Sequence, residues 1–183
     1  MHVAALSGLR LEEACGLTIG QCEGGVFDIR SGKTDAARRK VPLHPDLAPV
    51  VAFRCAGKEP SALLFPEAGE PDRYGKRGVN MSARFYKLRL KNGVDERAPG
   101  AKVSRINFHS FRRWFITRAV EAEQPPHVLR QVVGHKPPKD DVTMGVYSKA
   151  QLVAAKAACV AAVQLPAEVR AMLAVPPLPS RGG

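Results

Sequence analysis

The sequence lacks the patterns of a disulfide framework or a zinc site. Its 183 residues include four cysteines, which are scattered and form no CxxC pair. This favours free thiols in a reducing compartment. There is no recognisable signal peptide, and no apolar run approaches the roughly 20 residues of a membrane-spanning helix. Internal repeats are also missing. We therefore expect a cytoplasmic protein without a membrane segment.

Acidic residues are in the minority. Lys and Arg number 28 against 17 Asp and Glu, which gives a formal net charge of +11. The hydrophobic fraction of 45% is that of an ordinary globular protein, and the length fits one domain better than two. No long basic amphipathic segment indicates a membrane surface, so the charge favours a nucleic acid as partner. A merely basic protein without such a partner is the alternative.

The pattern predicts a mostly α-helical α+β fold with a small antiparallel sheet near the N-terminus. Two strand-like runs, residues 26–30 and 39–43, flank a polar turn, which is typical of a β-hairpin. Ser7 is expected to cap a first helix that carries Glu12 and Glu13 in its first turn. Further helices are expected over residues 46–54, 81–91, 108–122, 127–135, 149–163 and 166–173, a short strand over 63–65, and loops over 66–79 and 94–105.

One helical stretch, “FHSFRRWFIT” at residues 108–117, combines aromatic and basic side chains. His109 and Arg112 lie three positions apart and therefore share one face of the helix. Phe111 and Phe115 would anchor the helix in the core and leave the polar pair at a surface or cleft. A planar guanidinium beside an imidazole is suited to binding a phosphate group. A solvated helix face is the alternative interpretation.

Further residues of this kind follow in order along the chain. They are Arg10, Glu13 three residues later, Lys33 in the hairpin turn, His135 at a helix end, and Tyr147. Taken singly, each has an ordinary explanation, such as a helix ion pair, a solvated lysine or a packing tyrosine. Each signal is weak alone, but the ordered set is not.

Five segments in this order resemble the tyrosine recombinases, the phage-integrase type of site-specific DNA recombinase. They are “SGLRLEEACGL”, “SGKTDAARRKVPLHP”, “FHSFRR”, “VVGH” and “GVYSK”. The resemblance spans residues 6–149 and corresponds to the family's C-terminal catalytic domain. It implies a catalytic domain over residues 1–165 with an incomplete first helix, and a short helix with a flexible tail over 166–183. The N-terminal domain that completes the family's DNA clamp has no counterpart in the sequence.

The resemblance also implies an activity and a set of roles. The activity is cleavage and rejoining of double-stranded DNA through a 3′-phosphotyrosine intermediate, by a homo-tetramer on DNA, without a cofactor or metal. The matched residues are Arg10 and Arg112 for gripping the phosphate, His109 and His135 at the two histidine positions, Lys33 as the general acid, Glu13 as the acidic residue after the first arginine, and Tyr147 as the nucleophile.

Elementary chemistry agrees with this assignment. A phosphotyrosine conserves the phosphate ester, so rejoining needs no ATP. A phenol with a pKa of about 10 needs nearby cations to lose its proton. No acidic cluster suited to Mg²⁺ surrounds these residues, which separates the pattern from two-metal nucleases. The insertion-like “KPPKDD” before the tyrosine is a departure from the family. Two alternatives stay open: a DNA-binding remnant without recombinase activity, and a topoisomerase-like enzyme that nicks and reseals.

Overall fold

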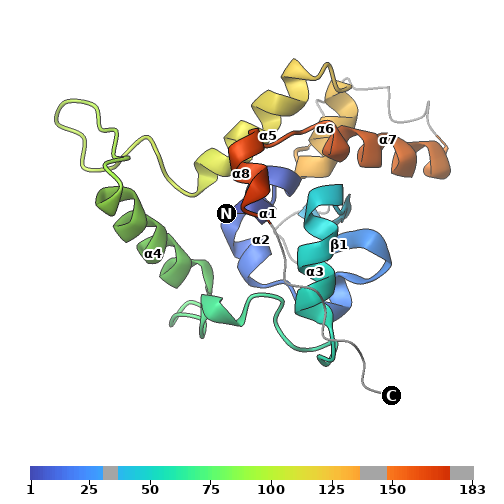
Figure 1. The fold of residues 1–183 in the computed structure, drawn as a ribbon, viewed down its shortest axis with the longest axis horizontal. Helices are drawn as coiled ribbons and strands as arrows, with labels where there is room; N and C mark the ends of the chain where they lie inside the picture. Colours follow the sequence, from blue (N-terminus) through green and yellow to red (C-terminus); the bar gives the residue numbers. More distant parts are fainter. Residues whose placement is uncertain (31–36, 137–147, 174–183) are drawn as a thin grey trace.

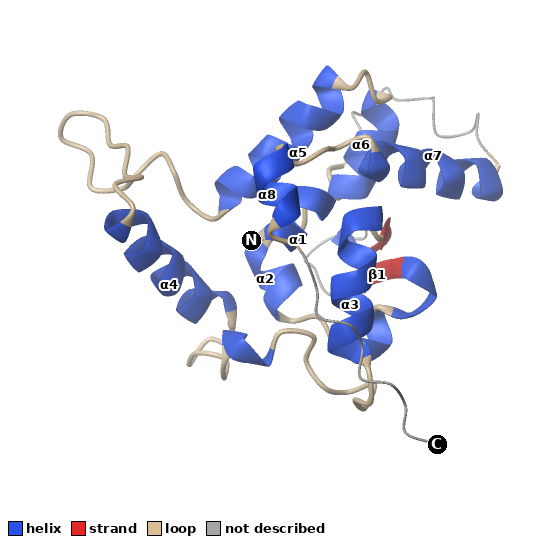
Figure 2. Ribbon diagram, in the orientation of Figure 1, coloured by secondary structure: helices blue, strands red, loops and turns tan. Residues whose placement is uncertain are grey.

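The fold is mostly helical, with one two-stranded antiparallel sheet near the N-terminus, as predicted (Figure 2). A computed structural model describes residues 1–30, 37–136 and 148–173. The sheet pairs β1 (Val26–Ile29) with β2 (Arg39–Pro42), and Ile29 lies opposite Arg39 at the end nearest the turn. The predicted hairpin is therefore confirmed, while its turn, which includes Lys33, lies outside the described residues.

The beginning of the chain differs from the prediction. Ser7 is the last residue of α1 (His2–Ser7), and Arg10 is the N-cap of α2 (Leu11–Cys15). The two helices are separate because Gly8 takes a left-handed conformation with φ 64° and ends α1. Gly8 also packs closely on α5, since a Cβ there would lie 2.7 Å from a ring carbon of Phe115. Expecting Ser7 to be the cap was wrong, because the break depends on this long-range contact.

The remaining helices lie close to the predicted ranges. They are α3 (Ala48–Cys55), α4 (Gly78–Lys91), α5 (His109–Glu121), α6 (Pro126–Val133), α7 (Lys149–Ala161) and α8 (Ala167–Ala171), with short 3₁₀ helices at Ile19–Gln21, Glu23–Gly25, Pro45–Leu47 and Pro66–Ala68. The strand expected over residues 63–65 was wrong, because Leu63 forms only an isolated bridge with Thr18. The loop over 94–105 is confirmed.

The hydrophobic core surrounds α1. This helix contacts α2 and α5, while α6 and α7 contact each other and β2. The core includes Leu6 of α1, Phe27 of β1, Phe115 of α5 and Val132 of α6. Figure 1 shows α5, α6 and α7 above α3 and the sheet, with α4 to one side. This packing brings the C-terminal ends of α1 and α6 together beside α5.

Across the described residues, no helix has both the length and the apolar character needed to cross a membrane.

Candidate active site

Arg112 of α5 is buried, with only 1% of its surface exposed. Its Nη1 donates to the carbonyl oxygen of Gly8 and its Nη2 to that of Val133, both at 2.5 Å. Both acceptors lie at helix C-terminal ends, where carbonyl groups lack helical partners. The sequence predicted that His109 and Arg112 lie at a surface or cleft. His109 is exposed, but Arg112 is buried, because α5 packs directly on the ends of α1 and α6. Within the described residues these bonds use two of its five N–H groups.

Arg10 is the accessible arginine of the site, with 40% of its side chain exposed. Its position at the N-cap of α2 places it three residues before Glu13, and its Nη1 donates to Glu13 Oε1 at 2.8 Å. The backbone N–H of Arg10 donates to the other carboxylate oxygen at 2.8 Å. Its Nη2 reaches the carbonyl oxygen of Gly134 at 3.5 Å, which is a weak contact. Glu13 therefore lies where the sequence predicted, beside the first arginine.

Arg39 of β2 is a member of the site that the sequence reasoning missed. Its side chain is 4% exposed, and it holds Glu13 in a fork, with Nη1 to Oε1 and Nη2 to Oε2, both at 3.0 Å. Its Nε donates to the carbonyl oxygen of Val132 at 2.7 Å. A signal existed in the sequence: alternation along the second strand places Arg39 on the same face as Val41, which is buried. An arginine on a buried face needs ionic partners.

The C-terminal end of α6 is where these arginines meet. The consecutive carbonyl oxygens of residues 132–134 accept hydrogen bonds from Arg39, Arg112 and Arg10, in that order. The end of a helix carries partial negative charge and unpaired carbonyl groups, so it attracts cations. The chain then turns through Gly134 in a left-handed conformation with φ 70°, and the N–H of His135 returns to Arg130. Arginines from three separate segments are thereby brought to the turn that carries His135.

The charges in this cluster act strongly on one another. Burial alone would raise the pKa of Glu13, but the hydrogen bonds and charges of Arg39 and Arg10 outweigh it and lower this pKa. Burial, together with the neighbouring Arg10 and Arg39, lowers the pKa of Arg112 to about 10. Arg112 therefore stays protonated at neutral pH. Lys156 of α7 is half-buried, and its pKa is lowered by burial and by Arg39.

Both predicted histidines are exposed near the arginines. Burial of part of the ring and then the charges of Arg112, Arg113 and Arg10 lower the pKa of His109. Partial burial is the largest cause that lowers the pKa of His135. The charges of Arg112, Arg10 and Arg39 lower it further, as does the neighbouring His109. Both imidazoles are therefore mainly neutral at pH 7, because the ordinary histidine pKa is already about 6.5. A neutral imidazole can donate one hydrogen bond and accept another.

Five of the predicted residues are thus brought together near the end of α6: Arg10, Glu13, His109, Arg112 and His135. The other two, Lys33 and Tyr147, lie outside the described residues, as does most of the “KPPKDD” insertion.

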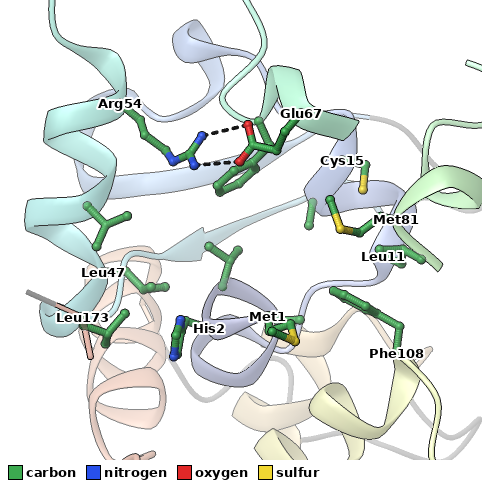
Figure 3. A pocket seen from close by; sticks show the side chains of 15 residues that line it. Met1, His2, Leu11, Cys15, Leu47, Arg54, Glu67, Met81, Phe108 and Leu173 are labelled. Carbon is green, nitrogen blue, oxygen red and sulfur yellow. Dashed lines mark hydrogen bonds and ion pairs between the residues drawn. The ribbon is translucent and has the colours of Figure 1, made fainter. Parts of the chain in front are cut away.

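A cavity of about 240 Å³ lies elsewhere, among α1, α2, α3 and α4 (Figure 3). Its lining is largely apolar, and an ion pair between Arg54 and Glu67, with a distance of 2.6 Å, lies on its wall. None of the residues of the arginine cluster lines it. The site is therefore a charged region around the end of α6, separate from this cavity. In the described parts of the chain, no group of three or more His, Cys, Asp or Glu residues could hold a metal ion.

Comparison with known proteins gives one match. A family model described as the phage integrase family matches residues 1–151, a range that includes the whole arginine cluster. No curated protein and no solved structure matches the chain significantly.

Proposed function

The chain belongs to the phage integrase family, whose model matches 151 of its 183 residues, and from this premise we propose that it cuts and rejoins double-stranded DNA through a 3′-phosphotyrosine intermediate. Membership supports a role in site-specific recombination in general, with DNA as the molecule acted on. The catalytic steps and the roles of single residues are our proposal.

The observation that carries the proposal is the gathering of three guanidinium groups at the C-terminal end of α6, two of which are paired with the carboxylate of Glu13. Arg10, Arg39 and Arg112 contribute three positive charges and Glu13 one negative charge, which leaves an excess of two near the end of α6. The lowered pKa of Arg112 reflects repulsion by Arg10 and Arg39 in addition to burial. A bound anion relieves this repulsion, and a phosphate diester of DNA is the anion on which the family acts.

The arginines would stabilise the charge that develops on phosphorus. Arg10 is exposed and Arg112 keeps N–H groups unused within the described residues. Both can donate to the nonbridging oxygens, whose charge grows in the pentacoordinate transition state. His109 and His135, neutral at pH 7, can donate to the same oxygens or accept the proton of the attacking phenol. In this proposal the four side chains form a preorganised cradle for a phosphate group.

The resemblance assigns the bond-making and bond-breaking groups. Tyr147 Oη attacks the phosphorus, the bond to the 5′ oxygen breaks, and Lys33 gives that oxygen a proton. The products are a 3′-phosphotyrosine and a free 5′ hydroxyl. Rejoining reverses these steps when a 5′ hydroxyl attacks the phosphotyrosine. We propose in addition that a homo-tetramer assembles on DNA, in the cytoplasm, with residues 1–165 as the catalytic domain.

A nicked duplex that releases a short fragment on cleavage tests this proposal, because the covalent protein–DNA adduct is then trapped. The wild-type chain should form an adduct that survives denaturation, and Tyr147→Phe should form none while it binds the same duplex. Tyr74→Phe is the matched control, since Tyr74 is 70% exposed, lies on a loop and has no hydrogen bond to the arginine cluster among the described residues.

Each outcome of this assay has a clear meaning. An adduct that persists in Tyr147→Phe would refute the nucleophile assignment. Binding without any wild-type adduct would favour the DNA-binding remnant. An adduct without strand exchange between two duplexes would favour a topoisomerase-like enzyme.

A further inference from the structure

Arg39 lies at the junction between the hairpin and the arginine cluster. It is the residue of β2 nearest the turn, paired with Ile29. Its side chain leaves the sheet and makes four hydrogen bonds: two to the carboxylate of Glu13, one to the carbonyl oxygen of Val132 and one to that of Ala37. β2 is thereby joined to both α2 and α6.

The bonds of Arg39 leave it little capacity to hold a phosphate itself. A guanidinium has five N–H groups, and four of them are used in these bonds. Its side chain is 4% exposed, whereas that of Arg10 is 40% exposed. Any contribution of Arg39 to catalysis must therefore pass through the groups that it holds.

Glu13 is the first of these groups. Oε1 accepts from Nη1 of both Arg10 and Arg39, and Oε2 accepts from the backbone N–H of Arg10 and from Nη2 of Arg39. The fork of Arg39 fixes the plane of the carboxylate, because two parallel N–H bonds permit one orientation. The carboxylate in turn fixes the guanidinium of Arg10.

The end of α6 is the second group. Arg39 binds the carbonyl oxygen of Val132, and the next two carbonyl groups bind Arg112 and Arg10 before the chain reaches His135. We propose that Arg39 is a positioning residue, which sets Arg10 through Glu13 and sets His135 through the end of α6, so that both meet one DNA phosphate. The inference rests on the proposed function.

The test uses the full chain and the nicked duplex, with single-turnover adduct formation at saturating protein. The variants are Arg39→Met, which removes charge and fork, and Arg39→Lys, which keeps the charge but cannot form the fork. Arg38→Met is the matched control, since it removes the same charge from an exposed neighbour that directly precedes β2. We expect both Arg39 variants to form adduct about 10–100-fold more slowly, as for other residues that orient a catalytic group, and Arg38→Met to match the wild type.

Two quantities distinguish a positioning role of Arg39 from an effect on folding stability alone. The amplitude of adduct formation gives the fraction of active molecules, and the rate constant gives the chemistry of those molecules. Positioning lowers the rate constant, whereas partial unfolding lowers the amplitude alone. DNA affinity should change by less than about threefold, because a buried arginine contacts no phosphate. A loss confined to amplitude, or a loss of affinity as large as the loss of rate, would overturn the inference.

A double-mutant cycle tests the route through Glu13. If Arg39 acts on Arg10 by holding this carboxylate, Glu13→Gln with Arg39→Met should be at most about threefold slower than the slower single variant, because coupled residues are not additive. If the rate losses of the two single variants instead multiply in the double variant, Arg39 does not act on Arg10 through Glu13. Arg39→Met alone leaves the buried carboxylate of Glu13 without the charge of Arg39, whereas the double variant removes both buried charges. If Arg39→Met does not fold, the double variant and Arg39→Lys are therefore used for the test.

The inference and the proposed function fail differently. If the wild type forms an adduct and both Arg39 variants form it at the wild-type rate, the inference alone is wrong. If the wild type binds DNA and forms no adduct, the proposed function is wrong and the inference falls with it.

Discussion

At the scale of single residues, Arg112 has a structural role in addition to the phosphate-binding role that the sequence predicts. The match to “FHSFRR” predicted a residue that grips phosphate, and the structure also shows it joining the ends of α1 and α6. The prediction and the observation are compatible, because two bonds leave N–H groups unused within the described residues. The position of the arginine could be predicted from the sequence. Its burial could not, since it depends on which helix ends pack against α5.

We predict that Arg112→Lys loses both stability and cleavage. An ammonium cannot bind both carbonyl groups as a planar fork does, and an unsatisfied buried acceptor costs roughly 1–3 kcal/mol. Removing one donor to a developing oxyanion slows cleavage by roughly 10²–10³-fold. Thermal unfolding and single-turnover cleavage measure the two effects, with Arg113→Lys as control, since Arg113 is exposed on the same helix. A folded Arg112→Lys chain that cleaves at the wild-type rate would show that this arginine is purely structural.

At the scale of elements, most of the fold could be predicted because its signals are local. The hairpin and the helices after residue 78 follow from alternation and helical spacing, and they lie close to the observed bounds. The break between α1 and α2 was missed because Gly8 is close to both Phe115 and Val133 through tertiary packing. Arg39 was missed for a related reason. Its strand position could be read locally, but its partners lie on α2 and α6, far away in the sequence.

A buried histidine links two of these elements and makes stability depend on pH. The Nδ1 of His44 accepts from the N–H of Asp46, just before α3, and its Nε2 bonds to the carbonyl oxygen of Val163, just after α7. Burial is the largest cause that lowers the pKa of His44, although Val163 and Asp46 raise it. The ring is therefore neutral in the folded chain at pH 7, and protonation would remove the acceptor on Nδ1.

We predict that the folded state loses stability as the pH falls below about 6.5, the ordinary histidine value. In this range the unfolded chain binds protons that the folded chain resists, so the free energy of unfolding decreases with falling pH. The loss is complete below the folded pKa. His109 and His135 have lowered pKa values too and contribute in the same direction. Unfolding should be followed from pH 7.5 to 5.0 in the wild type, in His44→Gln and in His109→Gln/His135→Gln. A pH dependence in His44→Gln as steep as in the wild type would contradict a role for His44.

At the scale of the whole molecule, the net charge of +11 sets how the chain meets DNA. Nucleic acids attract basic proteins mainly by releasing counterions from phosphates, a force that carries no sequence information. The resemblance implies that the second half of the DNA clamp belongs to another domain, so we expect residues 1–183, tested alone, to contact few base edges. Charge therefore predicts binding, but it does not predict discrimination between sites.

We predict steeply salt-dependent, weakly selective binding by residues 1–183. If about 6–10 phosphates are neutralised, affinity for a random duplex should fall roughly 10³–10⁵-fold between 50 and 200 mM salt, linearly on a log–log plot. Discrimination between a site selected from a random-sequence library and an unselected duplex should be at or below about 10³, the low end for specific proteins. Titrations at several salt concentrations measure both quantities. The control is Tyr147→Phe, which should reproduce the slope because phosphate contacts do not need the nucleophile. Nanomolar, site-selective binding at physiological salt would contradict this prediction and would mean that these residues read base edges without the second half of a clamp.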